Sequence, residues 1–331
     1  MLAYIARRTL MMIPMLVLLS IISFVIIQLP PGDYLTTYLN ARRAAGEVFN
    51  QAEIDALRAQ YGLDQSMYVQ YIKWISNIVL RGDFGRSFFW SRPVGDLLME
   101  RLPITMFVSL SSLLVVYALA IPIAIISAIY KYSWFDYLAT TFGFLGLAMP
   151  SFLLTLVISY LFFLASGTMV TNLFSLEYRE APWSIAKFLD LLSNVWLPIV
   201  IIGLSGTAGL IRTLRATLLD ELAKPYVVTA RSKGLTETKL LMKYPVRIAM
   251  NPVFSTIGWL LPGLINGGVI VGIVLNLQMI GPVLMQATLN QDMFLAGSVV
   301  LILGVLTVIG TLISDILLAW LDPRIRYGVE G

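Results

Sequence analysis

The chain has 331 residues, of which 58% are hydrophobic and 13% charged, with a net charge of +4 and a mean hydropathy of +0.82. Because soluble domains carry about 25% charged residues, and a soluble protein this apolar would expose large hydrophobic patches, the composition excludes an ordinary soluble domain and predicts an all-α polytopic membrane protein. With no Cys and no His, the sequence excludes disulfides, thiolate nucleophiles, a Ser-His-Asp triad and the common zinc sites, so no catalytic residue and no metal ligand is expected.

Six segments are long and apolar enough to cross a membrane as helices, which takes about 20 mostly apolar residues. They cover residues 9–29, 103–130, 137–166, 195–211, 248–279 and 294–320. The fourth is the shortest. The fifth is the longest and can accommodate a break into two helices. Six transmembrane helices place both termini on the same side of the membrane.

The first span has a second interpretation, because MLAYIARR followed by an apolar run resembles the start of a signal peptide. However, the run is 21 residues long and ends in QLPPGD without a small-residue cleavage site. The apolar region of a signal peptide is shorter, about 7–15 residues. We therefore expect residues 1–30 to be a retained N-terminal anchor and first transmembrane helix.

The loop after the first span, residues 31–102, contains two segments with helical periodicity, QAEIDALRAQYGL and MYVQYIKWISNIVL, and a turn in LRGDFGRSF. Its aromatic residues suit either a belt at the membrane surface or a surface that docks a partner. These residues are Tyr68, Tyr71, Trp74, Phe84, Phe88, Phe89 and Trp90. A second interfacial helix is expected in SLEYREAPWSIAKFLDLLSN, between the third and fourth spans.

The distribution of basic residues predicts the orientation. Thirteen Lys and Arg residues lie on the side of the termini, eight of them between Arg212 and Arg247, whereas the two short loops on the other side hold only Arg179 and Lys187. The positive-inside rule then places both termini, including the tail at residues 323–331, in the cytoplasm and residues 31–102 outside it. The net positive charge therefore needs no nucleic-acid partner.

Groups that would drive transport are missing from the spans. Asp315, near the cytoplasmic end of the last span, is the only ionisable acid or base inside them, whereas ion-coupled transporters place such groups at mid-membrane. The sequence also has no G-x-x-x-x-G-K-[ST] phosphate loop. We expect a chain that is not an enzyme. A secondary transporter, a channel and a structural membrane scaffold remain as alternatives.

Polar and helix-bending residues of the spans form a candidate translocation pathway. Asparagine and glutamine side chains in hydrocarbon should face protein or water, and prolines should kink their helices. The candidates are Pro150, Pro262, Asn266, Asn276 and Gln278. For Asn266, pore lining and interhelical hydrogen bonding are equally supported. Two glycine pairs with small-xxx-small spacing, Gly263 with Gly267 and Gly268 with Gly272, favour close helix packing over a pore role.

The most cationic stretch is KPYVVTARSKGLTETKLLMKYPVR, residues 224–247, and it predicts two short helices. Pro225 suits the first helical position, Gly234 suits the stop after the first helix, and Thr236 suits the N-cap of the second. Arg231 and Lys233 in the last turn complement the helix dipole. An isolated helix this short is unstable, so the membrane surface or a cytoplasmic partner must hold it; the residues alone favour neither.

Within this stretch, TARSKGLTETKLLMKYPVRIAMNPV resembles the cytoplasmic EAA loop of ABC-importer permeases, especially that of the dipeptide/oligopeptide permease family. The matching residues are Thr229 and Ala230 at the two alanines of the motif, Gly234 at its glycine, and Arg247, Ala249, Asn251 and Pro252 at its end. Val228 replaces the acidic residue of the motif. Six further stretches resemble the family in the same order: YIARRTLMMIPMLVLLSIISFVIIQLPPGD, YGLDQSMYVQYIKW, RGDFGRSF, RLPITMFVSL, GLAMPSF and LDPRIRYG.

This resemblance implies an ABC type I importer permease fold in a bacterial plasma (inner) membrane, with a permease core over residues 103–322 that includes a coupling loop at 212–247. Its implied partners are a second homologous permease, two cytoplasmic ATPase subunits, an extracytoplasmic solute-binding protein and membrane lipid. ATP and magnesium would bind the ATPase subunits, and this chain would bind no cofactor. The implied ATPase-coupling residues are Val228, Thr229, Ala230, Arg231, Ser232, Lys233, Gly234 and Leu235.

The resemblance also bounds the substrate. The family carries dipeptides and oligopeptides, and its relatives carry oligosaccharides, opines, metal chelates or glutathione. We expect peptides rather than oligosaccharides, with specificity residing mostly in the solute-binding protein.

Overall fold

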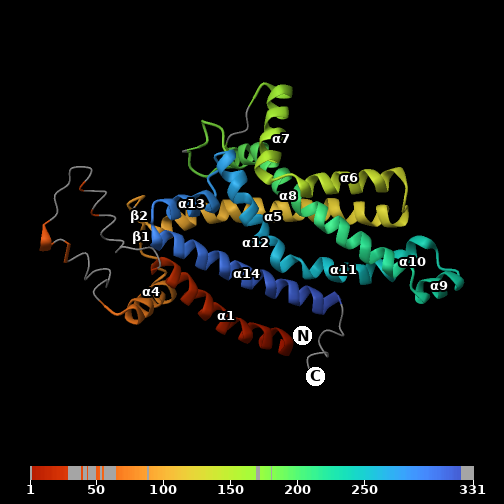
Figure 1. Ribbon diagram of the computed structural model, residues 1–331, viewed down its shortest axis with the longest axis horizontal. Coiled ribbons are helices and arrows are strands. Elements are labelled where there is room, and N and C mark those ends of the chain that lie inside the picture. Colours follow the sequence, from red (N-terminus) through yellow and green to blue (C-terminus); the bar gives the residue numbers. More distant parts are fainter. Residues whose placement is uncertain are drawn as a thin grey trace. The chain divides into compact units, whose positions relative to one another are not determined.

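This computed structural model describes residues 2–28, 39, 43, 50–52, 54–55, 65–87, 89–168, 172–179 and 181–321. The chain divides into two compact units. The first unit comprises Met1–Thr9, Ile104–Gln278 and Thr307–Gly331, and the second comprises Leu10–Pro103 and Met279–Leu306. Three long helices contribute residues to both units: α1 (Leu2–Gln28), α5 (Val94–Ile129) and α14 (Met293–Leu321) (Figure 1).

Four of the described helices are long and apolar enough to cross a membrane. The apolar stretches are Tyr4–Ile26 in α1, Val94–Ile129 in α5, Ile185–Leu204 in α8 (Ile185–Leu222), and Met293–Trp320 in α14. They correspond to the first, second, fourth and sixth predicted spans. The two remaining predicted spans are each divided into two helices.

The third predicted span is not one continuous helix. It forms α6 (Trp134–Ala148) and α7 (Ser151–Ser166), and Figure 1 shows α7 leaving α6 at a steep angle. Pro150 lies at the junction with φ −57° and ψ 139°. Proline has no N–H to donate and disfavours helical backbone in the residue before it, so the helix ends there. The predicted bend at Pro150 is thus confirmed as a break.

The fifth predicted span is also divided, as its length allowed. It comprises α11 (Pro245–Ser255) and α12 (Ile257–Val274), which meet at Thr256. The Tyr117 hydroxyl of α5 lies 3.1 Å from the Thr256 hydroxyl and donates to the carbonyl of Val253 at 3.1 Å. The junction between α11 and α12 is therefore anchored to α5.

The predicted interfacial helix before the fourth span is confirmed as a helix only in its second half, where it is continuous with the span. Its first half, where described, consists of turns and bends, and its second half forms the opening turns of α8. The Ser184 hydroxyl caps α8 by accepting from the Lys187 amide at 3.2 Å. An N-cap serine starts a helix, and nothing in the apolar sequence that follows stops it before the span.

The core of the first unit lies between α5, α8 and α11. Small residues on α5 face larger ones on α8, and the buried residues are Val116, Ala120, Ala124 and Ala128 on α5, Leu210, Ile211, Leu214 and Leu218 on α8, and Val246, Ala249 and Val253 on α11. Small side chains allow helix backbones to approach closely. A Cβ atom added at Gly203 of α8 would lie only 3.5 Å from the Ser112 carbonyl oxygen of α5.

Close packing by α12 involves Gly258 and not Gly263. A Cβ atom at Gly258 would lie 3.0 Å from the Cα of Thr311 in α14, whereas one at Gly263 would meet nothing within 4 Å. The predicted packing role is therefore wrong for Gly263 within this chain. Gly268 and Gly272 are buried, as close packing requires.

Two ion pairs in the first unit join elements that are distant in sequence. Asp136 at the start of α6 is 2% exposed. Its carboxylate accepts hydrogen bonds from Nε and Nη2 of Arg215 in α8, each at 2.7 Å. It also accepts from the hydroxyl of Ser127 in α5. Asp315, the ionisable residue noted in the last span, pairs with Arg8, whose Nη1 lies 3.3 Å from its Oδ2.

In the second unit, α4 (Met67–Arg81) confirms the predicted helix in MYVQYIKWISNIVL and packs on α1. The Phe24 ring lies 5.5 Å from the Tyr71 ring and 5.7 Å from the Trp74 ring. The Tyr71 hydroxyl lies 2.8 Å from the Ser20 hydroxyl. Tyr71 and Trp74 thus belong to the core, while Tyr68 and Phe89 are exposed. The predicted helix at QAEIDALRAQYGL lies mostly outside the described residues.

The predicted turn in LRGDFGRSF is confirmed, and it leads into a short hairpin. Gly82 and Gly85 have φ of 66° and 85°, which favours glycine. Strands β1 (Arg86–Ser87) and β2 (Arg92–Pro93) then pair antiparallel. The buried Asp292, between α13 (Ile280–Leu289) and α14, accepts from the Ser87 hydroxyl at 2.5 Å and so anchors this hairpin.

Candidate functional site

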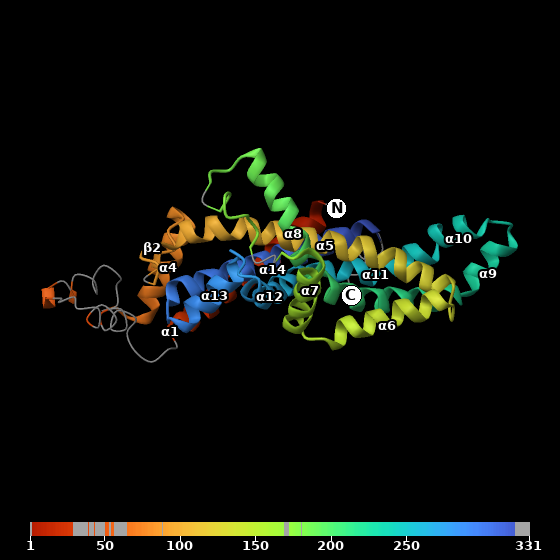
Figure 2. The same ribbon diagram turned by 90° about the horizontal axis from the view of Figure 1, so that it is seen from above.

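The cationic stretch forms two short helices, α9 (Pro225–Ser232) and α10 (Glu237–Lys243), between α8 and α11. Figure 2 shows them at the ends of those two helices. Pro225 occupies the first turn of α9, and Gly234 follows its C-cap with φ 76°. A Cβ atom at Gly234 would meet nothing within 4 Å, so the left-handed backbone, not a lack of space, explains the glycine. Thr236 is the N-cap residue of α10.

A small core between α9 and α10 holds the pair together. Val227 and Ala230 of α9 and Leu240 of α10 are buried, and Tyr226, Leu235, Leu241 and Tyr244 pack around them. The Tyr226 and Tyr244 rings lie 6.4 Å apart. This core supplies the support that an eight-residue helix lacks when isolated. The α9–α10 hairpin is therefore stabilised by contacts within the chain.

Two polar contacts fix the orientation of the hairpin. The Tyr226 hydroxyl donates to Glu221 Oε2 of α8 at 2.6 Å, and burial together with this acidic partner raises the pKa of Tyr226. Arg231 donates to Glu237 through Nε at 2.5 Å and Nη2 at 3.1 Å. This hydrogen-bonded pair lowers the pKa of Glu237 and raises the pKa of Arg231. Both members are exposed, so the pair orients side chains more than it stabilises the fold.

The structure divides the eight candidate coupling residues into two groups. Ala230 is buried and Leu235 packs against the small core, so both support the hairpin from inside. The other six are exposed: Val228, Thr229, Arg231, Ser232, Lys233 and Gly234. Val228 is 57% exposed although it is apolar, and Ser232, one turn further, donates its hydroxyl to the Val228 carbonyl at 3.1 Å. The outer face of α9 thus combines an exposed valine with small polar groups.

The candidate pathway residues lie on different elements of the described structure. Pro150 lies at the α6–α7 junction, whereas Asn276 and Gln278 follow α12. Pro262 and Asn266 lie in α12, but their side chains are outside those described. The two possibilities for Asn266 thus stay open.

Asn276 has a structural role that the sequence did not suggest. Its φ is 51°, and it follows the last residues of α12. The Leu277 amide donates to the Gly272 carbonyl at 2.7 Å, and the Asn276 amide donates to the Ile273 carbonyl at 3.2 Å. This pattern is a Schellman motif, in which asparagine is tolerated in the left-handed position. Asn276 therefore terminates α12, whether or not it also contacts a substrate.

Comparison with known proteins identifies the family of this helical chain. The model of the binding-protein-dependent transport system inner membrane component matches residues 120–327, which include α9 and α10. The chain belongs to this family of ABC-importer permeases. The model of the N-terminal region of the same membrane components matches residues 1–111. Together, the two matches cover nearly all of this permease, which is accordingly a multi-pass membrane protein.

The permease is similar over its whole length to several named relatives. It is 36% identical to the oligopeptide transport system permease protein AppB of Bacillus subtilis, covering 98% of this chain and 99% of the relative. It is 32% identical to a putative peptide permease protein of Brucella suis, covering 98% and 99%. It is 31% identical to the glutathione transport system permease protein GsiC of Escherichia coli, covering 99% and 100%.

Sequence reasoning missed the contacts between distant residues in this permease. Asp136 and Arg215 are 79 residues apart on different helices, and no spacing rule connects them. Tyr226 and Glu221 are five residues apart but lie on either side of the break between α8 and α9, which no helical spacing rule spans. A local signal existed only for the Arg231–Glu237 pair, because both residues flank the predicted turn at Gly234. The ion pair between α6 and α8 could be found only from the tertiary structure.

Proposed function

We propose that this permease is one of two homologous transmembrane subunits of an ATP-driven importer of peptides, and that α9 is the helix through which it couples to a cytoplasmic ATPase. The chain would have six transmembrane segments and cytoplasmic termini, would bind no nucleotide or magnesium itself, and would receive substrate from an extracytoplasmic binding protein in a bacterial plasma membrane. Val228, Thr229, Arg231, Ser232, Lys233 and Gly234 would face the ATPase, and Ala230 and Leu235 would hold α9 in shape.

The observation that carries this proposal is the construction of α9. The helix begins at Pro225, ends before the left-handed Gly234 and is backed by its own small core, yet its outer face leaves Val228 exposed. A rigid helix transmits a displacement that a flexible loop would absorb. An exposed apolar side chain on such a helix favours a protein partner, because burying it is favourable by about 25 cal/mol for each Å² removed from water.

The proposed pathway draws support from two features. The break between α6 and α7 and the Schellman motif after α12 leave irregular backbone around Pro150, Asn276 and Gln278. Such backbone is tolerated at membrane depth only where it is buried in protein or lines a water-filled cavity. We include Pro262 and Asn266 of α12 in the proposed pathway on their sequence alone.

The absence of cysteine allows a direct test of orientation and docking. We expect Val228→Cys to be labelled by a membrane-impermeant maleimide only from the cytoplasmic side, and to be protected when the ATPase subunits are bound. Leu80→Cys on α4 should be labelled only from outside, because it is exposed and lies in the predicted extracytoplasmic loop. Labelling of intact cells and of inside-out vesicles, with and without ATPase subunits, measures both.

Met242→Cys provides the matched control. Met242 of α10 is 58% exposed, almost the same as Val228, and it should be labelled from the same side without protection by the ATPase. Labelling of Val228→Cys from outside would refute the proposed orientation. If the ATPase subunits protect both cysteines equally, or protect neither of them, the outer face of α9 is not the specific contact.

The proposed substrate class follows the relatives, two of which are named as peptide permeases and one as a glutathione permease. We expect the assembled transporter, reconstituted in vesicles with its binding protein, to take up labelled oligopeptides when ATP is present on the ATPase side. Uptake of oligosaccharides with no uptake of any peptide would contradict this assignment. It would leave the role of α9 intact.

A further inference from the structure

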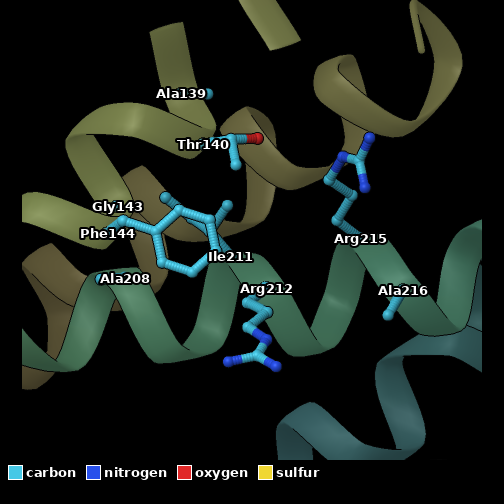
Figure 3. A pocket seen from close by; sticks show the side chains of 9 residues that line it. All are labelled: Ala139, Thr140, Gly143, Phe144, Ala208, Ile211, Arg212, Arg215 and Ala216. Carbon is cyan, nitrogen blue, oxygen red and sulfur yellow. The ribbon is translucent and has the colours of Figure 1, made fainter. Parts of the chain in front are cut away.

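A pocket of about 250 Å³ lies between α6 and α8, within the first unit (Figure 3). Small residues leave this space open: Ala139 and Gly143 on α6, and Ala208 and Ala216 on α8. The Phe144 ring and Ile211 form an apolar wall. None of these residues belongs to the α9–α10 hairpin or to the proposed pathway, so the proposed function assigns no role to this pocket.

The two arginines of this pocket differ in their partners. The Arg215 guanidinium is bonded to the carboxylate of Asp136 and to the Ser127 hydroxyl, so its charge is compensated. Arg212 is exposed, and Figure 3 shows its side chain extending from α8 in a different direction from that of Arg215. Among the described residues, no carboxylate forms an ion pair with Arg212. Within the described part of the chain, the pocket therefore carries one positive charge without an acidic partner, beside an apolar wall.

Exposed aromatic residues mark the depth at which this pocket would lie in a membrane. Four of them, each at least 56% exposed, occupy the turn between α5 and α6 and the first turn of α6: Tyr130, Tyr132, Trp134 and Tyr137. The Lys131 ammonium lies 4.6 Å from the centre of the Tyr132 ring. Tyrosine, tryptophan and lysine concentrate where the bilayer meets water. Ala139 and Thr140 of the pocket follow within one turn, so the pocket opens near the lipid headgroups.

We propose that the α6–α8 pocket binds an anionic phospholipid, with the phosphate paired to Arg212 and an acyl chain along Phe144 and Ile211. Basic pockets between transmembrane helices suit anionic headgroups, and the apolar wall suits a hydrocarbon chain but not free phosphate. The site is additional to the proposed function. Only the identification of this leaflet as the cytoplasmic one rests on the proposed orientation.

The binding test uses the assembled transporter, stripped of lipid in detergent and titrated with phosphatidylglycerol or phosphatidylcholine under native mass spectrometry. We expect one tightly bound phosphatidylglycerol for each copy of this chain, and weaker binding of phosphatidylcholine. Arg212→Gln should weaken phosphatidylglycerol binding about fivefold, the effect of one basic residue at a membrane surface. Lys239→Gln, which removes an exposed lysine from α10, should leave it unchanged.

A second variant separates the apolar wall from the charge. Gly143→Val should fill the pocket and abolish tight lipid binding with Arg212 still present. A Cβ atom at this position would meet only Ala208, at 4.0 Å, so the backbone should tolerate it. Inorganic phosphate at millimolar concentration should not displace the lipid. Displacement by phosphate would identify a phosphate site and overturn the proposal, as would equal binding of the two lipids.

The alternative occupant of this pocket is a helix of the second permease. If Gly143→Val releases the second permease and neither variant changes lipid binding, the pocket is a subunit interface and the proposal is wrong.

The same samples report separately on the proposed function. A transporter that retains its ATPase subunits but shows no preference for phosphatidylglycerol overturns the lipid site alone, whereas a sample without ATPase subunits contradicts the role of α9.

Discussion

Replacing Asp136 with Ala is expected to destabilise the protein by roughly 3–5 kcal/mol, because removal of one member of a buried ion pair leaves the other charge without compensation. The carboxylate is 2% exposed and holds Arg215 through two bonds of 2.7 Å, together with the Ser127 hydroxyl. Its loss would release α6 from α5 and α8. Thermal unfolding of the detergent-solubilised protein, followed by tryptophan fluorescence, measures the effect.

Two variants test whether the cause is the unpaired charge. Combining Asp136→Leu with Arg215→Met should recover most of the lost stability, since apolar residues of similar volume can replace a buried pair at little cost. Asp315→Ala breaks the more exposed pair with Arg8 and should cost about 1 kcal/mol or less. If Asp136→Ala unfolds at the wild-type temperature, the pair does not stabilise the fold.

The Asp136–Arg215 pair also predicts that the stability of the protein depends on pH. The hydrogen bonds from Arg215 hold the pKa of Asp136 well below its ordinary value of 3.8. The stability that it contributes is therefore fully present above that value and is lost as the pH falls through the lower pKa of the folded protein. The difference between the wild type and Asp136→Asn should accordingly be constant from neutral pH down to about pH 4 and shrink only below it.

Ala230→Glu is expected to abolish ATP-dependent uptake and co-purification of the ATPase subunits while the chain still inserts into the membrane. Ala230 is 7% exposed and packs beside Val227 and Leu240. A carboxylate at this position has no partner in the small core, and burying it would cost several kcal/mol. The α9–α10 hairpin should open instead, so α9 would lose the rigidity that coupling needs.

Limited proteolysis between α8 and α11 should then cleave Ala230→Glu faster than the wild type. The matched control is Ala223→Glu, which introduces the same charge at an exposed position just before α9 and should retain both uptake and ATPase binding. Normal uptake by a protein with an opened hairpin would show that the shape of α9 does not matter for coupling.

Most of the local structure could be predicted from the sequence. Pro225 and Gly234 marked the start and the end of α9, and Thr236 marked the start of α10, because each residue type strongly prefers the backbone conformation found at its position. The apolar runs of α1, α5 and α14 likewise predicted helices, and the basic motif around Gly234 led to the family. These signals act within a few residues of their cause.

The tertiary structure decided the features that depend on distant residues. The sequence could not show that the short α9 is supported by α10, because the buried contact of Val227 with Leu240 exists only after the chain folds back at Gly234. It could not assign Arg215 and not Arg212 to Asp136, since both arginines share one helix. Propensity and hydropathy act along the chain, whereas charge pairing and close packing depend on which helices meet.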